Sequence, residues 1–193
     1  MSFDENDLMN REFLEERHNA LLNELKLLCN KLPETYQQKM TDSFLSELAN
    51  SLLDKTVFDI VKNLKDIQVM TENNLLERRM KLIYSHDAIK EKMIEHHKEA
   101  LANEIRVNPR NAEVLRARQI SELEATDKHN ENELNLLDMK IIMELDQTVS
   151  DQQITLEKVG VPGFFVTNKP ADVKLQMHLL EFITILSIKD GIE

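Results

Sequence analysis

The stretch RVNPRN at residues 106–111 separates two long segments without a helix-breaking residue. Pro109 disfavours helical backbone at the residue before it and suits the first turn of a following helix. Nothing interrupts a helix over residues 56–106, and the next helix is expected to continue to Gly160, which provides a C-terminal stop. The stretch therefore predicts a reversal between two helices, each on the order of 75 Å long.

The two long segments also predict a register. If the chain reverses at Pro109, positions whose numbers add up to about 217 face each other across an antiparallel pair. Both seams are apolar at their ends and polar in the middle, where Asp87 faces Asn130 and Lys90 faces Asp127. A polar layer in a helix seam costs stability but fixes register. This agreement favours a hairpin over a straight rod, with a chance match of heptads as the alternative.

Two shorter helices are expected before the hairpin. Leucines spaced by threes and fours mark a helix over residues 6–32, which Pro33 ends. A polar connection over residues 34–40 leads to Thr41, a suitable N-cap for a second helix with a broad apolar stripe. Thr56 either restarts the helix or lies within a continuous one.

The character of the sequence changes at residues 160–170, which read GVPGFFVTNKP. The run predicts an ordered turn or a short extended piece, because it is too apolar for a flexible linker. Adjacent phenylalanines in extended backbone face opposite sides, so one could enter the core while the other meets a partner. The last helix is expected to be apolar almost all round and to need burial on several sides. The candidate interaction or structural residues are Gly160, Pro162, Gly163, Phe164, Phe165, Pro170, Leu180 and Phe182.

Together these patterns predict an all-α protein. Its expected centre is a long antiparallel, coiled-coil-like helical hairpin, accompanied by an N-terminal helix pair and an apolar C-terminal helix. The expected division is residues 1–40 for the N-terminal helix and connection, 41–159 for the hairpin, and 160–193 for the turn and last helix, within one structural unit.

Composition restricts the partners and the compartment. With 24 Lys and Arg against 35 Asp and Glu, the net charge of −11 repels nucleic acid and anionic lipid, so neither is an expected direct ligand. No stretch reaches the roughly 20 apolar residues of a membrane span. A lone Cys29 and an N-terminus without a signal pattern favour an intracellular location, in the cytoplasm, the nucleus or both.

Sites for chemistry are poorly represented. All three glycines lie at or after residue 160, so the sequence contains neither the glycine motif of a phosphate-binding loop nor that of a dinucleotide-binding site. His96 and His97 point about 100° apart on a helix, so with His86 they are expected to be solvated or at a seam edge and not metal ligands. Cys29 lies on an apolar face and is expected to be a buried thiol.

The acidic residues Glu144, Asp146 and Asp151 are expected to be solvated carboxylates. The sequence therefore predicts no catalytic residue, metal, cofactor or small-molecule ligand. It favours a non-catalytic adaptor or scaffold that binds protein partners, a homodimer among them. The alternatives are an obligate subunit of a larger complex, whose last helix is buried by another protein, and, less favoured, an enzyme that uses the three acidic residues.

Short motifs carry a family resemblance over about residues 32–186. The later motifs are ELD at 144–146, DQQ at 151–153, TLEK at 155–158, GV at 160–161, GF at 163–164, VT at 166–167, Pro170, LQM at 175–177 and LLE at 179–181. The earlier motifs are LP at 32–33, QQ at 37–38, LLD at 52–54, TVF at 56–58, IV at 60–61 and TE at 71–72. With these motifs the chain resembles the DiGeorge syndrome critical region protein family, most of all its insect branch, the gonadal proteins.

The resemblance implies a small, coiled-coil-like protein of the nucleus and cytoplasm with no assigned enzyme activity. It also implies a link to development, through neural-crest derivatives in vertebrates and gonads in insects. No functional residues come with the resemblance.

Overall fold

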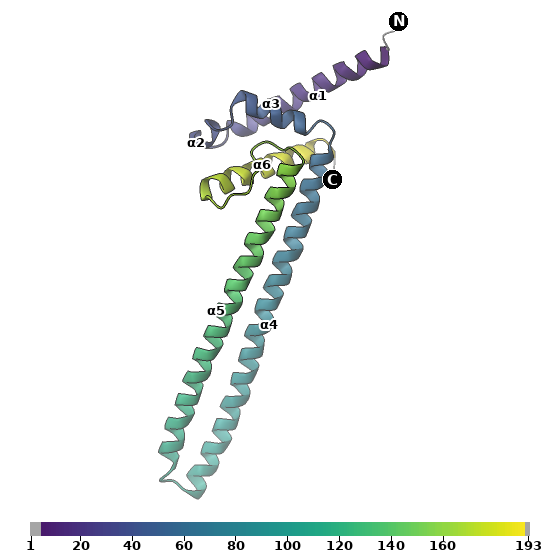
Figure 1. The fold of residues 1–193 in the computed structure, drawn as a ribbon. Helices are drawn as coiled ribbons and strands as arrows, with labels where there is room; N and C mark the ends of the chain where they lie inside the picture. Colours follow the sequence, from purple (N-terminus) through teal and green to yellow (C-terminus); the bar gives the residue numbers. More distant parts are fainter. Residues whose placement is uncertain (1–4, 192–193) are drawn as a thin grey trace. The chain divides into compact units, whose positions relative to one another are not determined.

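The computed structural model describes residues 5–191, and these residues form helices and connections with no strand. The all-α class predicted from the sequence is confirmed. The helices in chain order, shown in Figure 1, are α1 (Glu5–Cys29), α2 (Glu34–Gln37), α3 (Asp42–Ser51), α4 (Thr56–Val107), α5 (Ala112–Lys158) and α6 (Pro170–Lys189). None of the described helices combines the length and apolar content that a membrane crossing needs.

The chain divides into two compact units. We call residues 1–68 with 147–193 the terminal unit, and residues 69–146 the central unit. This division differs from the expected one at residues 40 and 159, because α4 and α5 each contribute residues to both units. The first turns of α4 and the last turns of α5 supply Phe58, Val61 and Leu156 to the core of the terminal unit.

Local interactions explain where the first helices end. The helix α1 ends at Cys29, earlier than expected, because the following residues form tight turns in which Leu32 N donates to Cys29 O at 3.0 Å. The expected polar connection contains the single turn α2, which Pro33 precedes. The Thr41 hydroxyl caps α3 by accepting from Phe44 N at 3.3 Å.

The helix restarts before α4. Lys55 has a positive φ of 68°, which breaks the helical backbone between α3 and α4. The Asp54 carboxylate then accepts from Thr56 N at 3.1 Å, at the first residue of α4. Of the two possibilities that the sequence left open, the structure shows a new helix that begins at Thr56, and not a continuous helix.

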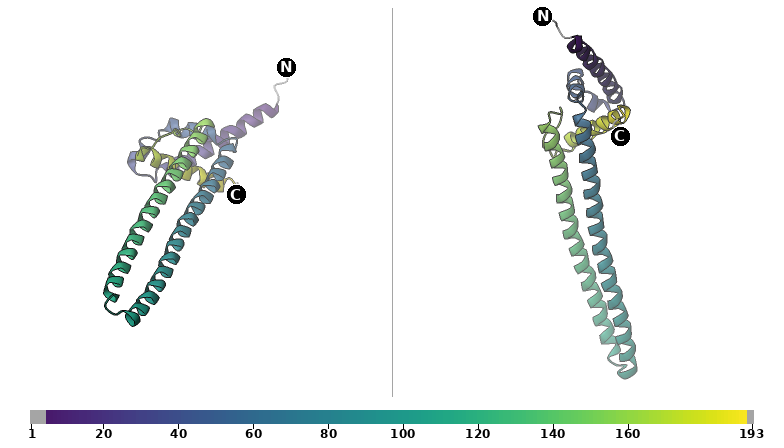
Figure 2. Two further views of the ribbon diagram at one scale, coloured as in Figure 1. Left: turned by 60° about the horizontal axis from the view of Figure 1, so that its bottom comes forward. Right: turned by 90° about the vertical axis from the view of Figure 1, so that its right-hand side faces the viewer.

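The core of the terminal unit joins five helices. In the terminal unit, α1 lies against both α3 and α6, and α6 crosses the adjoining parts of α4 and α5 (Figure 2). The side chains that the core buries most completely are Leu25, Leu48, Leu52, Phe58, Leu156, Leu179 and Ile183. Each buried side chain of this size contributes about 1.5–3 kcal/mol relative to exposure. The apolar helix α6 is thus covered within its own chain.

The central unit consists of α4 and α5 segments that run antiparallel and meet at a turn over residues 108–111 (Figure 1). Pro109 lies in this turn, and α5 begins later than expected, at Ala112. The reason is Asn111, whose side chain donates to Glu104 Oε1 at 2.7 Å and whose carbonyl accepts from Leu115 N at 3.0 Å. The helical hydrogen bonds of α5 thus begin at the Asn111 carbonyl.

Candidate interaction surfaces

The connection between α5 and α6 is held by two buried glutamines. Gln153 Nε2 donates to Thr167 O at 2.9 Å, and Thr167 N donates back to Gln153 Oε1 at 3.2 Å. Gln176 Nε2 donates to Gly163 O at 3.2 Å and to Phe165 O at 3.0 Å. The two amides also bind each other at 2.8 Å. Because buried polar groups need partners, these bonds fix the course of the connection.

The two glycines in this connection have different roles. Gly160 has a φ of +79° and ends α5 in a Schellman motif, with Val161 N donating to Leu156 O and Gly160 N donating to Glu157 O, both at 3.0 Å. Gly163 has a φ of +85°, and a Cβ there would lie 2.8 Å from Leu179 Cδ1. Gly160 is therefore required for backbone conformation alone, whereas Gly163 is also required for space.

The remaining candidates divide between the interior and the surface. Phe164 is 6% exposed and Phe165 44%, the alternation expected of neighbours in extended backbone. Phe182 is buried in the core, and Leu180 is half-buried. Pro162 is half-buried, and Pro170 is exposed at the first position of α6.

Next to the connection lies a cleft of about 330 Å³ with mixed amide and apolar walls. Gln152 Nε2 donates to Gln68 Oε1 at 2.9 Å across it. Met177 and Leu180 of α6 supply apolar walls. The sequence did not predict the structural role of the four glutamines, although three of them lie in the motifs DQQ and LQM; the available signal was Gln176, an amide within the apolar pattern of α6.

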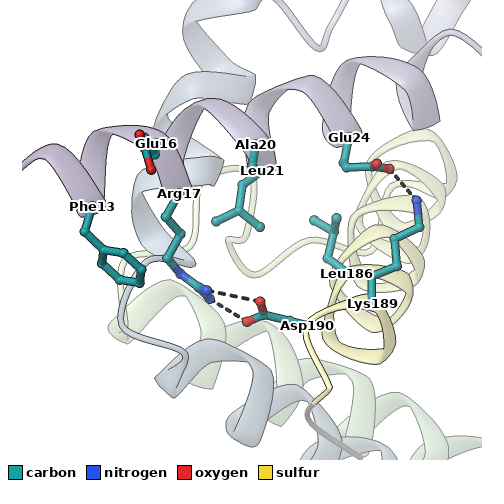
Figure 3. Close-up of a pocket in the computed structure, with 9 residues that line it drawn as sticks. All are labelled: Phe13, Glu16, Arg17, Ala20, Leu21, Glu24, Leu186, Lys189 and Asp190. Atoms are coloured by element: carbon teal, nitrogen blue, oxygen red, sulfur yellow. Dashed lines mark hydrogen bonds and ion pairs between the residues drawn. The ribbon is translucent and has the colours of Figure 1, made fainter.

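A second groove, of about 410 Å³, lies between α1 and the C-terminal end of α6. Figure 3 shows Arg17 pointing to Asp190 at one end and Lys189 pointing to Glu24 at the other. Its apolar lining comes from Ala20, Leu21 and Leu186 in the middle and from Phe13 at the side.

The Arg17–Asp190 pair ties α6 to α1. The guanidinium donates to both carboxylate oxygens, at 3.0 and 2.6 Å, and its Nε donates to Leu53 O at 3.2 Å. These hydrogen bonds, with help from Lys55 at 3.2 Å, lower the pKa of Asp190 below its ordinary value. The pair is thus a charge-assisted link between the two ends of the chain, and sequence reasoning missed it because the partners are so far apart in sequence.

Ion pairs connect α4 to α5 along the central unit. Lys90 Nζ lies 2.6 Å from Asp127 Oδ1, whereas the other register residues, Asp87 and Asn130, are exposed and half-buried. The further cross-helix pairs are Arg78–Glu144 and Arg79–Asp138 at 2.8 Å, His86–Glu133 at 2.9 Å and His97–Glu122 at 3.0 Å. These pairs set an antiparallel register for the two segments.

Several groups considered for chemistry have structural partners. Glu144 binds Arg78, and Asp151 accepts from Gln147 at 2.8 Å. Burial raises the pKa of the Cys29 thiol, which disfavours the reactive thiolate. Across residues 5–191, no group of three or more His, Cys, Asp or Glu side chains is arranged to hold a metal ion.

Apolar side chains of the central unit face solvent. On α5, Met139 is 62% and Met143 70% exposed, and Leu136 is exposed one turn before them. Their spacing of three and four residues places them on one side of the helix. We call Leu136, Met139 and Met143 the α5 apolar face. The central unit contains no further helix that covers it.

The fold and these surfaces define an all-α protein of two helical units. Residues 2–192 match the family model described as DiGeorge syndrome critical region 6 (DGCR6) protein, and the chain belongs to this family. It is 46% identical to protein DGCR6 of Gallus gallus over 177 residues, which cover 92% of this chain and 87% of the chicken protein.

The chain is also similar to the gonadal protein gdl of Drosophila melanogaster. The identity is 38% over 177 residues, which cover 91% of this chain and 82% of the fly protein. The relatives thus include the insect branch that the motifs favoured, while the chicken protein has the higher identity of these two. No solved structure matches the chain.

Proposed function

We propose that this protein is a non-catalytic helical adaptor that binds other proteins through its central unit. The observation that carries the proposal is the α5 apolar face, which presents two methionines and a leucine to solvent. A contiguous exposed apolar surface is characteristic of protein-binding sites. Methionine is well suited to such a site, because its flexible and polarisable side chain adapts to different partners.

The charged groups of the central unit support an adaptor over an enzyme. His86 Nε2, His97 Nε2 and the Glu144 carboxylate form pairs between α4 and α5. Such pairs hold two long helices in register, which keeps the α5 apolar face in a defined position. A rigid helix face is the surface that helix-binding partners recognise.

An obligate subunit of a larger complex is the alternative. The sequence favoured this alternative on the expectation that another protein buries the last helix. That expectation no longer supports it, because Leu179, Phe182 and Leu186 of α6 are buried in the terminal unit. The observation that favours it is the same α5 apolar face, which a permanent partner would cover. Aggregation of the isolated chain that co-expression with a partner cures would identify this case.

We further propose an intracellular adaptor, of the cytoplasm or the nucleus, that acts in development or the germline. The support comes from the names of its relatives, which refer to a developmental syndrome region and to the gonad. The buried free thiol of Cys29 suits a reducing compartment.

The experiment is an affinity purification with proximity crosslinking of the full chain and of Met139→Glu/Met143→Glu. Both positions are exposed, so folding is retained, but a carboxylate on the α5 apolar face opposes apolar contact. We expect loss of the partners that the unchanged chain captures. The matched control Ala117→Glu/Ser121→Glu adds the same charge at exposed positions of α5, several turns away from the α5 apolar face, and should retain them. An unchanged partner set in the first variant would contradict the proposal.

A further inference from the structure

The side chains of residues 9–16, in the first half of α1, make little contact within the chain. Residues 9–16 are all exposed, including Met9 at 69% and Phe13 at 59%. Figures 1 and 2 show these turns of α1 extending beyond α3 and α6 within the terminal unit. A helix of so few residues is marginal in water unless an apolar face is buried. Burial of Met9 and Phe13 against a partner surface would stabilise these turns.

The exposed half of α1 is amphipathic and acidic. Helical spacing places Met9 and Phe13 on one side, and Glu12 and Glu16 lie beside them on that same side. Residues 9–16 hold three glutamates against one arginine. The matching surface is thus apolar and basic.

The central unit contains such a surface. A groove of about 670 Å³ between α4 and α5 is lined by Leu82, Leu136 and Leu137, with Ser85 and Glu133, and by the three cations Arg78, Lys81 and Lys140. We call it the basic groove. The lining thus holds three cations and one carboxylate, in a chain whose net charge is −11.

The cations of the basic groove are available to an incoming helix. Lys81 pairs with Glu77 one turn away, and Arg78 pairs with Glu144. Both are exposed ion pairs, which contribute little and exchange readily. Leu136 is exposed at the floor, so an arriving apolar side chain removes it from water.

We propose that the first half of α1 docks into the basic groove of a second copy of this chain. Met9 and Phe13 pack on the leucine floor, while Glu12 and Glu16 face Lys81 and Lys140 of the second copy. Reciprocal exchange of α1 between two copies gives a closed dimer with two identical contacts. The inference rests on the proposed function, because the docked helix would cover Leu136, which the basic groove shares with the α5 apolar face.

The test is sedimentation velocity of the full chain over a concentration series at low and high salt. We expect a dimer that weakens as salt rises. Lys81→Glu/Lys140→Glu and Glu12→Lys/Glu16→Lys should each weaken dimerisation at least about tenfold, because like charges then meet. The chain that carries all four substitutions should dimerise again, because the charges are exchanged and complementary.

The matched control is Lys92→Glu/Lys128→Glu, which makes the same charge change at exposed lysines outside the basic groove and should dimerise as the unchanged chain does. Circular dichroism verifies that every variant keeps its helix content. A monomer at all concentrations, or a dimer that neither reversal weakens, would overturn the inference. If the chain with all four substitutions does not dimerise again, α1 is not the helix that binds the basic groove. The partner set lost in Met139→Glu/Met143→Glu is read independently, so a failed dimer leaves the adaptor proposal standing.

Discussion

The terminal and central units are both helical, yet they use their apolar residues in different ways. The terminal unit draws on short helices and helix ends to bury a core that includes Leu48 and Phe58. In the central unit, the buried residues among those described are Leu75, Ala112 and Gln119. Ion pairs between α4 and α5 supply much of its register. The difference teaches that one unit buries its apolar side chains in a core, whereas the other leaves many of them exposed to solvent.

The largest expected effect contrasts two leucine truncations. Leu48→Ala opens a cavity in the terminal core and should lower the free energy of unfolding by about 2–5 kcal/mol. Leu136→Ala, at an exposed position of the central unit, should change it by less than about 0.5 kcal/mol. Urea unfolding followed by circular dichroism measures both. Equal losses would remove the distinction between the units.

The next effect concerns the glycines after α5. Gly163→Ala combines a positive φ with a Cβ that meets Leu179 and Phe44, and should lower stability by about 2–3 kcal/mol. Gly160→Ala meets open space and should lose only about 1 kcal/mol of backbone strain. Thermal unfolding compares them. If Gly163→Ala does not melt at a lower temperature than Gly160→Ala, the backbone at Gly163 does not pack closely against Leu179.

A smaller effect depends on pH. Because Arg17 lowers the pKa of Asp190 in the folded chain, the pair stabilises the terminal unit above the ordinary carboxyl pKa of about 4. This stabilisation is lost as the pH falls through the lowered value. Asp190→Asn should therefore be less stable than the unchanged chain by about 1 kcal/mol at pH 6, with the gap closing toward pH 3. If the difference in unfolding free energy between the two chains does not change with pH, the substitution acts through packing and not through the charge of Asp190.

The smallest effect is the Lys90–Asp127 pair. Both side chains are more than a third exposed, so solvent screening limits their coupling to about 0.2–1 kcal/mol. A double-mutant cycle with Lys90→Ala and Asp127→Ala, measured by urea unfolding, should give a value in this range that falls with added salt. A coupling above about 2 kcal/mol would mean that the central unit relies on this pair far more than its exposure suggests.

The sequence predicted features that depend on local patterns. Thr41 caps α3, Gly160 ends α5 and Pro170 begins α6, because cap and turn residues act on neighbouring backbone. The contact of Lys90 with Asp127 also followed from a pattern, since matching polar layers are visible in one dimension.

Features that depend on distant partners were not predictable. Arg17 and Asp190 lie at opposite ends of the chain, and no periodicity joins them. Gln153 looks like a surface residue until the connection brings the carbonyl of Thr167 to it. The uninterrupted helical pattern of α4 likewise does not reveal that its first turns contribute to the core of the terminal unit.

The central claim is that the α5 apolar face meets another polypeptide. A photoreactive amino acid in place of Met139, with one in place of Ser121 as the control on the same helix, tests it in cells. The proposed function predicts strong crosslinks from position 139 to another protein chain and few from position 121. Crosslinks from position 139 that stay within its own chain, or that match those from position 121, would contradict it.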